Sequence, residues 1–177
     1  MSSAASFRHT LAQLLAARFP LIYVESHEEQ RVLAEIDAVH SAPDAPRALW
    51  TWSITQGLCR PGEAAQRGTH EAHTALSAVR GIPERAVFVF CDLHVFLGDG
   101  TRPADPVVVR MLRDVVREFR NGVLARTVVL VGPVLRIPPE LDKDVTVLDF
   151  PLPRESEIRG LLDAMIAENA GAVAVSI

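Results

Sequence analysis

Residues 85–97, RAVFVFCDLHVFL, decide the fold class. Ala86 to Phe90 form a continuous apolar run of strongly β-forming residues, and Asp92 follows shortly after it. Uninterrupted apolar runs of this length are typical of parallel strands that helices cover on both faces. The run therefore predicts a central strand whose carboxyl end carries Asp92 and His94. Ligands of open α/β sheets bind at that end, so any chemistry of this chain is expected there.

The remaining apolar runs alternate with helical patterns along the chain. Further strands are predicted at 21–26, 48–54, 126–132 and 144–150, and helices at 6–18, 26–40, 70–80, 105–121 and around Ile158 to Ile166. Strands that alternate with helices in this way are typical of a parallel sheet between two helical layers. The predicted fold is therefore an α/β three-layer sandwich around a mainly parallel five-stranded sheet.

The composition is that of an ordinary globular domain. The chain has 177 residues, of which 49% are hydrophobic and 23% charged, and its formal net charge is −4. These values do not indicate disorder or a nucleic-acid surface. Two cysteines cannot form a disulfide framework or a four-ligand zinc site. The sequence shows no secretory signal and no apolar run of the roughly 18 to 20 residues that span a bilayer, so we expect a soluble, cytoplasmic protein without a membrane partner.

The turn after the first strand lacks the residues that bind phosphate. A phosphate loop, G-x-x-x-x-G-K-S/T, needs glycines and a lysine at this point. The segment from Leu21 to His40 has no glycine, and Lys143 is the only lysine of the chain. Ser26 is predicted to cap the following helix by accepting from the amide of Glu29, which leaves one amide fewer for an anion. Glu28 and Glu29 add negative charge, so we expect no Mg-ATP binding there.

Other sequence patterns give weak support for chemistry. Asp92 stands where a Walker B aspartate would stand, but Leu93 replaces the acid that would activate water. A structural role for Asp92 at the end of a strand or in the next turn is the simpler interpretation. His70 and His73 lie three residues apart without a third ligand nearby, so solvated histidines are favoured over a metal site. Dinucleotide-binding and nucleophile-elbow motifs are absent. We therefore predict no catalytic residue and no metal in this chain.

Two surface features could contact a partner. Arg110, Arg113, Arg117 and Arg120 repeat along one side of the helix at 105–121, although the interleaved Asp114 and Glu118 favour a solvated, ion-paired face. The strand at 48–54 is predicted to be an exposed edge, followed by a mobile loop at 55–68. Trp50 and Trp52 on that edge could dock another chain, or could simply be packed.

Three segments together carry a family resemblance. These are FPLIYVESHEEQRV (19–32), VFVFCDLHVFL (87–97) and TVVLVGPVLRIPPELDKDVTVLDFPLP (127–153). Across about 20–168 the chain resembles the amino-terminal half of the Ycf-type or SpoVK-like AAA+ ATPases of bacteria and plastids. The resemblance implies a P-loop-type strand order, 5-1-4-3-2, without a working phosphate loop. It also implies a following helical lid and a second, catalytic AAA+ domain, so ATP and magnesium are expected only in the full-length protein.

The resemblance divides the chain into three parts. Residues 1–19 would be a helix packed on the domain, 20–169 the AAA+-like α/β domain, and 170–177 the lead-in to the lid. We expect a truncated chain, because unpaired apolar residues continue to Ile177.

We expect a non-hydrolysing regulatory, docking or assembly domain whose partners are its own carboxyl-terminal AAA+ domain and an unknown protein. The full-length protein could also be an oligomer. One alternative is a domain that senses a nucleotide or another small ligand at the strand ends. Another is a self-standing enzyme in which Asp92 and His94 act as an acid–base pair. The weak candidate binding residues are Glu25, Ser26, Asp92, His94 and Gly132.

Overall fold

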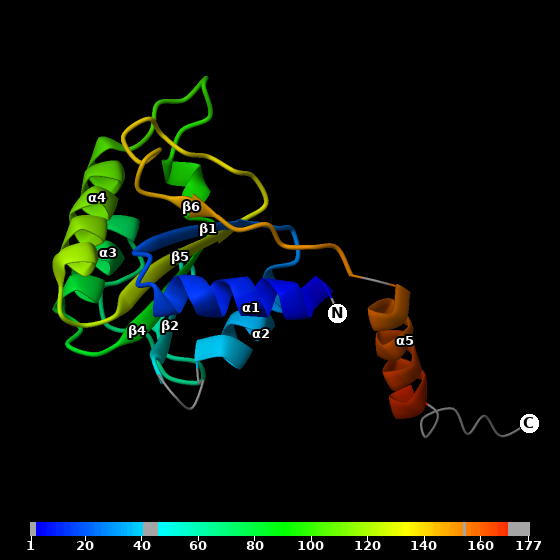
Figure 1. The fold of residues 1–177 in the computed structure, drawn as a ribbon. Coiled ribbons are helices and arrows are strands. Elements are labelled where there is room, and N and C mark those ends of the chain that lie inside the picture. The colour runs from blue at the N-terminus through cyan, green and yellow to red at the C-terminus, as the bar shows by residue number, and fades with distance from the viewer. Residues whose placement is uncertain (1–2, 41–45, 154, 170–177) are drawn as a thin grey trace, which may run out of the picture.

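One sheet of six strands forms the centre of the computed structural model, which describes residues 3–40, 46–153 and 155–169. The strands are β1 (Leu21–Glu25), β2 (Ala48–Ser53), β3 (Gly57–Cys59), β4 (Ala86–Cys91), β5 (Arg126–Gly132) and β6 (Thr146–Val147). Their order across the sheet is β3-β2-β4-β5-β1-β6 (Figure 1). The five predicted strands are therefore parallel and in the predicted order, with β3 added at one edge.

Strand β4, which lies within residues 85–97, and its neighbour β5 form the middle of this sheet. Every residue of β4 and of β5 is buried, and the two strands pair in parallel with Phe88 opposite Val128. Each strand therefore has neighbours on both sides and helices on both faces, which is why its sequence shows no polar alternation.

Helices cover both faces of the sheet. The covering helices are α1 (Ser3–Ala16), α2 (Glu29–His40), α3 (Ala72–Gly81) and α4 (Pro106–Asn121). A short 3-10 helix η1 (Leu93–Phe96) follows β4, and α5 (Glu155–Asn169) stands apart from the sheet (Figure 1). Helices α3 and α4 share one buried cluster with the sheet, and α1 and α2 share the other. The three-layer α/β sandwich is thus confirmed. As predicted, α4 begins at an Asp105 cap, whose carboxylate accepts from the amides of Val107 and Val108.

The edge of the sheet differs from the prediction. Strand β3 lies within the segment that was expected to be a mobile loop, and it pairs antiparallel with β2, so that Trp52 is opposite Leu58. The strand 48–54 is therefore not an edge. A left-handed Gly57 (φ 74°) makes the tight turn between the two strands possible. Thr69 then binds the returning strand, because its hydroxyl accepts from the amide of Leu58.

Trp50 and Trp52 are consequently buried, and the prediction that they form a partner surface is wrong. Trp52 is 1% exposed and its indole nitrogen donates to the carbonyl of Thr69 at 2.7 Å. Trp50 is 8% exposed and its indole nitrogen donates to the carboxylate of Glu84. Both rings lie on the α3–α4 side, whereas Leu49 lies on the other side.

Strand β6 is shorter than the seven-residue strand predicted at 144–150. It pairs with β1 only through Thr146 and Val147, and the amide of Leu148 adds one bond to Tyr23. The chain then leaves the sheet towards α5 (Figure 1). None of the described helices is long and apolar enough to cross a membrane.

Candidate functional site

The carboxyl ends of β1, β4 and β5 meet at one edge of the sheet. The amide of Ser26 donates to the carbonyl of Gly132, and the amide of Asp92 donates to that of Val131, both at 2.9 Å. Parallel neighbours bring their ends together, so the structure places Glu25, Ser26, Asp92 and Gly132 side by side, as the sequence suggested. What these ends can bind depends on the free groups that remain there.

Ser26 uses its hydroxyl inside the turn that leads to α2. Its Oγ accepts from the amide of Glu28 at 3.0 Å, and α2 begins only at Glu29. The Ser26 hydroxyl therefore binds the amide of Glu28 and not the predicted amide of Glu29, one residue later, which makes the turn tighter. Arg31 forms an ion pair with the carboxylate of Glu28. One backbone amide and one carboxylate of this turn are thus occupied within the turn itself.

Glu29 places negative charge beside the end of β4. The pKa of the Cys91 thiol is raised to about 12, first because the thiol is buried and then because of the charge of Glu29 and a hydrogen bond with it. Cys91 is therefore a neutral, inert thiol. The position of Glu29 adds to the repulsion that an incoming phosphate would meet at these strand ends.

His94 fills the space above Gly132. Helix η1 follows Asp92, which adopts a left-handed conformation with φ 58°, and carries the imidazole back over β5. A Cβ atom at Gly132 would lie only 2.8 Å from Nδ1 of His94. The side chain of His94 is 13% exposed, and its buried Nδ1 atom has no hydrogen-bond partner within the part of the chain that the structure describes. The glycine therefore makes room for the imidazole.

We expect Gly132→Ala to lower the free energy of unfolding by about 1–2 kcal/mol, since the new methyl group and the imidazole overlap. Urea denaturation would measure the change. In a His94→Ala background, which removes the ring, the same substitution should cost less than about 0.5 kcal/mol. An equal cost in both backgrounds would show that His94 does not occupy this space.

Asp92 and His94 do not form a hydrogen-bonded pair. The atoms Oδ1 of Asp92 and Nδ1 of His94 are 3.6 Å apart, which is too long for a hydrogen bond. The Asp92 side chain is 60% exposed. Neither residue lines either of two cavities that border α4. The geometry brings the two groups near each other without a hydrogen bond between them.

The larger cavity lies beside the beginning of α4. Its volume is about 1090 Å³, and it is bordered by the loop 97–104, the first turns of α4 and the segment 134–140. A second depression of about 230 Å³ lies further along α4 and is lined by Arg110, Arg113, Asp114, Val116, Arg117, Arg120 and Asp144. Arg110 and Arg113 line both. Sequence analysis missed the larger cavity, because the segment 134–140 that closes it is distant in the sequence from the loop and helix that form its other walls.

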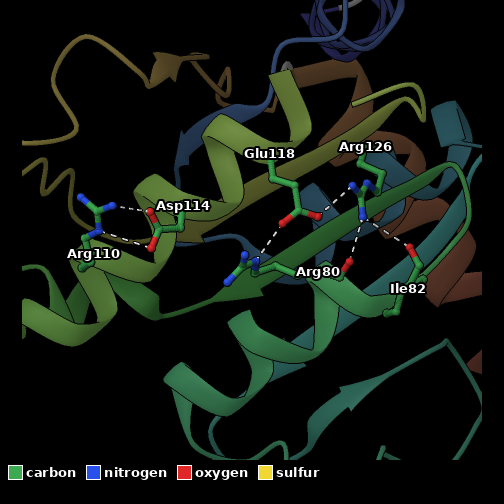
Figure 2. Close-up of polar contacts among 6 residues, drawn as sticks. All are labelled: Arg80, Ile82, Arg110, Asp114, Glu118 and Arg126. Atoms are coloured by element: carbon green, nitrogen blue, oxygen red, sulfur yellow. Dashed lines mark hydrogen bonds and ion pairs between the residues drawn. The ribbon is translucent and has the colours of Figure 1, made fainter. Parts of the chain in front are cut away.

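The arginine row of α4 is only partly neutralised. Figure 2 shows Glu118 turned towards Arg80 and Arg126, which lie on other elements, at 2.8 and 3.1 Å. Asp114 pairs with Arg110 at 2.8 Å, one turn away on the same helix. Within the part of the chain that the structure describes, Arg113 and Arg117 have no ion-pair partner. The predicted pairing along the helix therefore holds for Asp114 but not for Glu118.

Possible metal ligands are dispersed. His73 lies in α3, and His70 lies in the turn before it. The described residues include no group of three or more histidine, cysteine or acidic side chains that could hold an ion.

Comparisons with known proteins agree on one family. A family model described as the N-terminal domain of SpoVK-like AAA ATPases matches residues 7–150. A protein of Guillardia theta named uncharacterized AAA domain-containing protein ycf46 is 32% identical over 157 residues, which are 87% of this chain and 29% of that protein. Its namesake in Trieres chinensis is 28% identical over 90% of this chain and 31% of that protein. The chain thus spans about a third of the length of these curated relatives.

A solved structure supports the fold. A chain in the E. coli MS115-1 HORMA:CdnC:Trip13 complex matches with a TM-score of 0.61 and 15% identity, over 94% of this chain and 68% of that chain. At this level of identity the likeness concerns the fold alone.

Proposed function

This chain belongs to the family of SpoVK-like AAA ATPase N-terminal domains, and we propose that it is a non-hydrolysing docking and assembly domain of a larger AAA+ ATPase. ATP and magnesium would be bound by a second AAA+ domain of the longer protein. That domain would also be the first partner of this one. The relatives are about three times as long as the segment that they share with this chain, which leaves room for such a domain.

The observation that carries the proposal is the turn between β1 and α2. A phosphate loop would occupy this position in a nucleotide-binding sheet of the same strand order. Here the Ser26 hydroxyl takes one amide, and Glu28 and Glu29 bring two carboxylates to the turn. His94 takes up space over the neighbouring strand end. These features support a domain that acts through protein contacts rather than through hydrolysis.

We expect calorimetric titration of this chain with Mg-ATP or Mg-ADP to give no saturable heat up to millimolar concentration. The turn has no glycine and no lysine, and the Ser26 hydroxyl occupies one of its amides, so contacts that supply phosphate affinity are missing. A double variant, Glu28→Gln with Glu29→Gln, is the matched control, because it removes the local negative charge and leaves the turn intact. One-to-one binding by the unmodified chain would contradict the proposal.

A second candidate is a ligand-sensing domain, and one observation favours it. The buried Nδ1 atom of His94 has no hydrogen-bond partner among the described residues, and it lies 3.6 Å from the exposed carboxylate of Asp92. A small polar ligand could therefore satisfy both groups. Saturable nucleotide binding that disappears in Asp92→Ala would support this candidate over the first. We assign no reaction to Asp92 and His94, because the pair adjoins neither described cavity.

A further inference from the structure

Helix α5 presents an apolar face that the other described residues leave exposed. Ile158, Leu162 and Ile166 recur at helical spacing and are 46%, 52% and 66% exposed. Large aliphatic side chains in such a row usually pack against another element. Figure 1 shows α5 standing apart from the sheet and its helices.

The sheet has no free face for α5. Helices α3 and α4 cover one face, and α1 and α2 cover the other. Helix α1 lies where the chain leaves β6: Phe7 packs edge-on against Phe150, with 4.9 Å between ring centroids. Arg8 of α1 also forms an ion pair with the buried Glu35 of α2. The apolar row of α5 therefore needs a surface other than the sheet.

A suitable surface is the larger cavity beside α4, which we name the α4 groove. Its walls are largely apolar, and its volume of about 1090 Å³ exceeds that of most small-molecule pockets, roughly 300–1,000 Å³. Val134 and Leu135 on its wall are 41% and 38% exposed. Further apolar lining residues are Leu97, Pro103, Val109 and Ile137. Such a groove is suited to the apolar side of a helix.

The charges of the α4 groove and of α5 are complementary. Arg110 and Arg113 lie where the groove joins the second depression, and Arg113 has no ion-pair partner among the described residues. Helix α5, ESEIRGLLDAMIAEN, contains four acidic residues and one arginine. The whole chain is acidic, with a formal net charge of −4, whereas the arginine row of α4 is a basic surface that can attract acidic side chains.

We propose that α5 of one copy of this chain docks in the α4 groove of a second copy. The apolar row at Ile158, Leu162 and Ile166 would enter the groove, and Asp163 would lie near Arg113. This inference rests on the proposed assembly function and names a partner for it.

A second copy suits the geometry better than the same chain. Figure 1 shows α4 and α5 on opposite sides of the sheet. Leu148 is tied to Tyr23 at the strand edge, and only six residues separate it from Glu155. Six residues span at most about 21 Å, which limits how far α5 can travel round its own domain.

The proposal is tested by sedimentation velocity of the whole chain at concentrations from about 1 to 200 µM. The unmodified chain is compared with variants in which one charge is reversed. We expect the unmodified chain to self-associate. Arg113→Glu and Asp163→Lys should each weaken the association at least tenfold, and an equimolar mixture of the two variants should regain it, because one groove and one helix are again complementary. Arg67→Glu, a charge reversal at an exposed position of the loop before α3, is the matched control and should have no effect.

Several outcomes would overturn the proposal. A monomer throughout the concentration range would exclude a second copy as the occupant, and so would variants that associate like the unmodified chain. Failure of the mixture to associate would exclude the contact between groove and helix. None of these results alters the nucleotide titration, so this inference can fail while the proposed non-hydrolysing role stands.

Discussion

Trp52→Ala is expected to lower the free energy of unfolding by about 4 kcal/mol, the largest effect that we predict for a single substitution. The indole is 1% exposed, and its ring centroid lies 5.3 Å from that of Phe90. Its removal leaves a cavity between the sheet and α3 and deprives the carbonyl of Thr69 of its donor. A loss of this size is a large part of the 5–15 kcal/mol that stabilises a typical domain.

Urea denaturation followed by circular dichroism would measure this loss. Val123→Ala is the control, because Val123 is 89% exposed and its truncation should change stability by less than about 0.5 kcal/mol. Trp52→Phe should lie between the two, since it keeps an aromatic ring and loses the hydrogen bond. An unchanged stability in Trp52→Ala would restore the idea that this ring is an exposed contact.

Glu118→Ala is expected to cost about 2–3 kcal/mol. Its carboxylate joins Arg80, at the end of α3, to Arg126, at the start of β5 (Figure 2). The side chain of Arg126 is only 8% exposed, and it also donates to the carbonyl of Arg80. Removing one partner of a buried ion pair leaves a charge without compensation. We take a value below the usual 3–5 kcal/mol, because Glu118 itself is 34% exposed.

Asp114→Ala is the matched control for this prediction. Asp114 lies on the same helix and also pairs with an arginine, but Arg110 is 62% exposed, so the loss should stay below about 1 kcal/mol. Urea denaturation would measure the free energy of unfolding of both variants. Equal losses would show that the burial of Arg126 does not increase the contribution of its ion pair to stability.

The pH dependence of stability provides a second test of Glu118. Hydrogen bonds from Arg80 and then from Arg126 lower the pKa of its carboxyl below the ordinary 4.5. A lowered pKa in the folded state means that the stabilisation is fully present above the unfolded value and is lost as the pH falls through the folded value. The difference in stability between the unmodified chain and Glu118→Gln should thus be largest near neutral pH and should shrink below about pH 4.

Some features of the strand ends at the candidate site are predictable from the sequence, and others are not. Glu25, Asp92 and Gly132 were expected to converge, because parallel strands end at a common edge. The absence of a phosphate loop was equally visible, since that motif is local. The position of His94 over Gly132 was not foreseeable, because it depends on the path of η1 across to a strand almost forty residues later.

The sequence by itself determined the α/β class, the buried central strands and the Asp105 cap, because strand burial and helix capping are expressed in neighbouring residues. Only the tertiary structure decided that β3 covers the edge beside Trp52, that Glu118 turns to Arg80 and Arg126, and that the α4 groove exists. The last two features join residues that are distant in the chain, and the first depends on Thr69, which lies beyond the loop that follows β3. Periodicity specifies which face of an element is apolar, whereas the strand order and the packing of helices specify what that face meets.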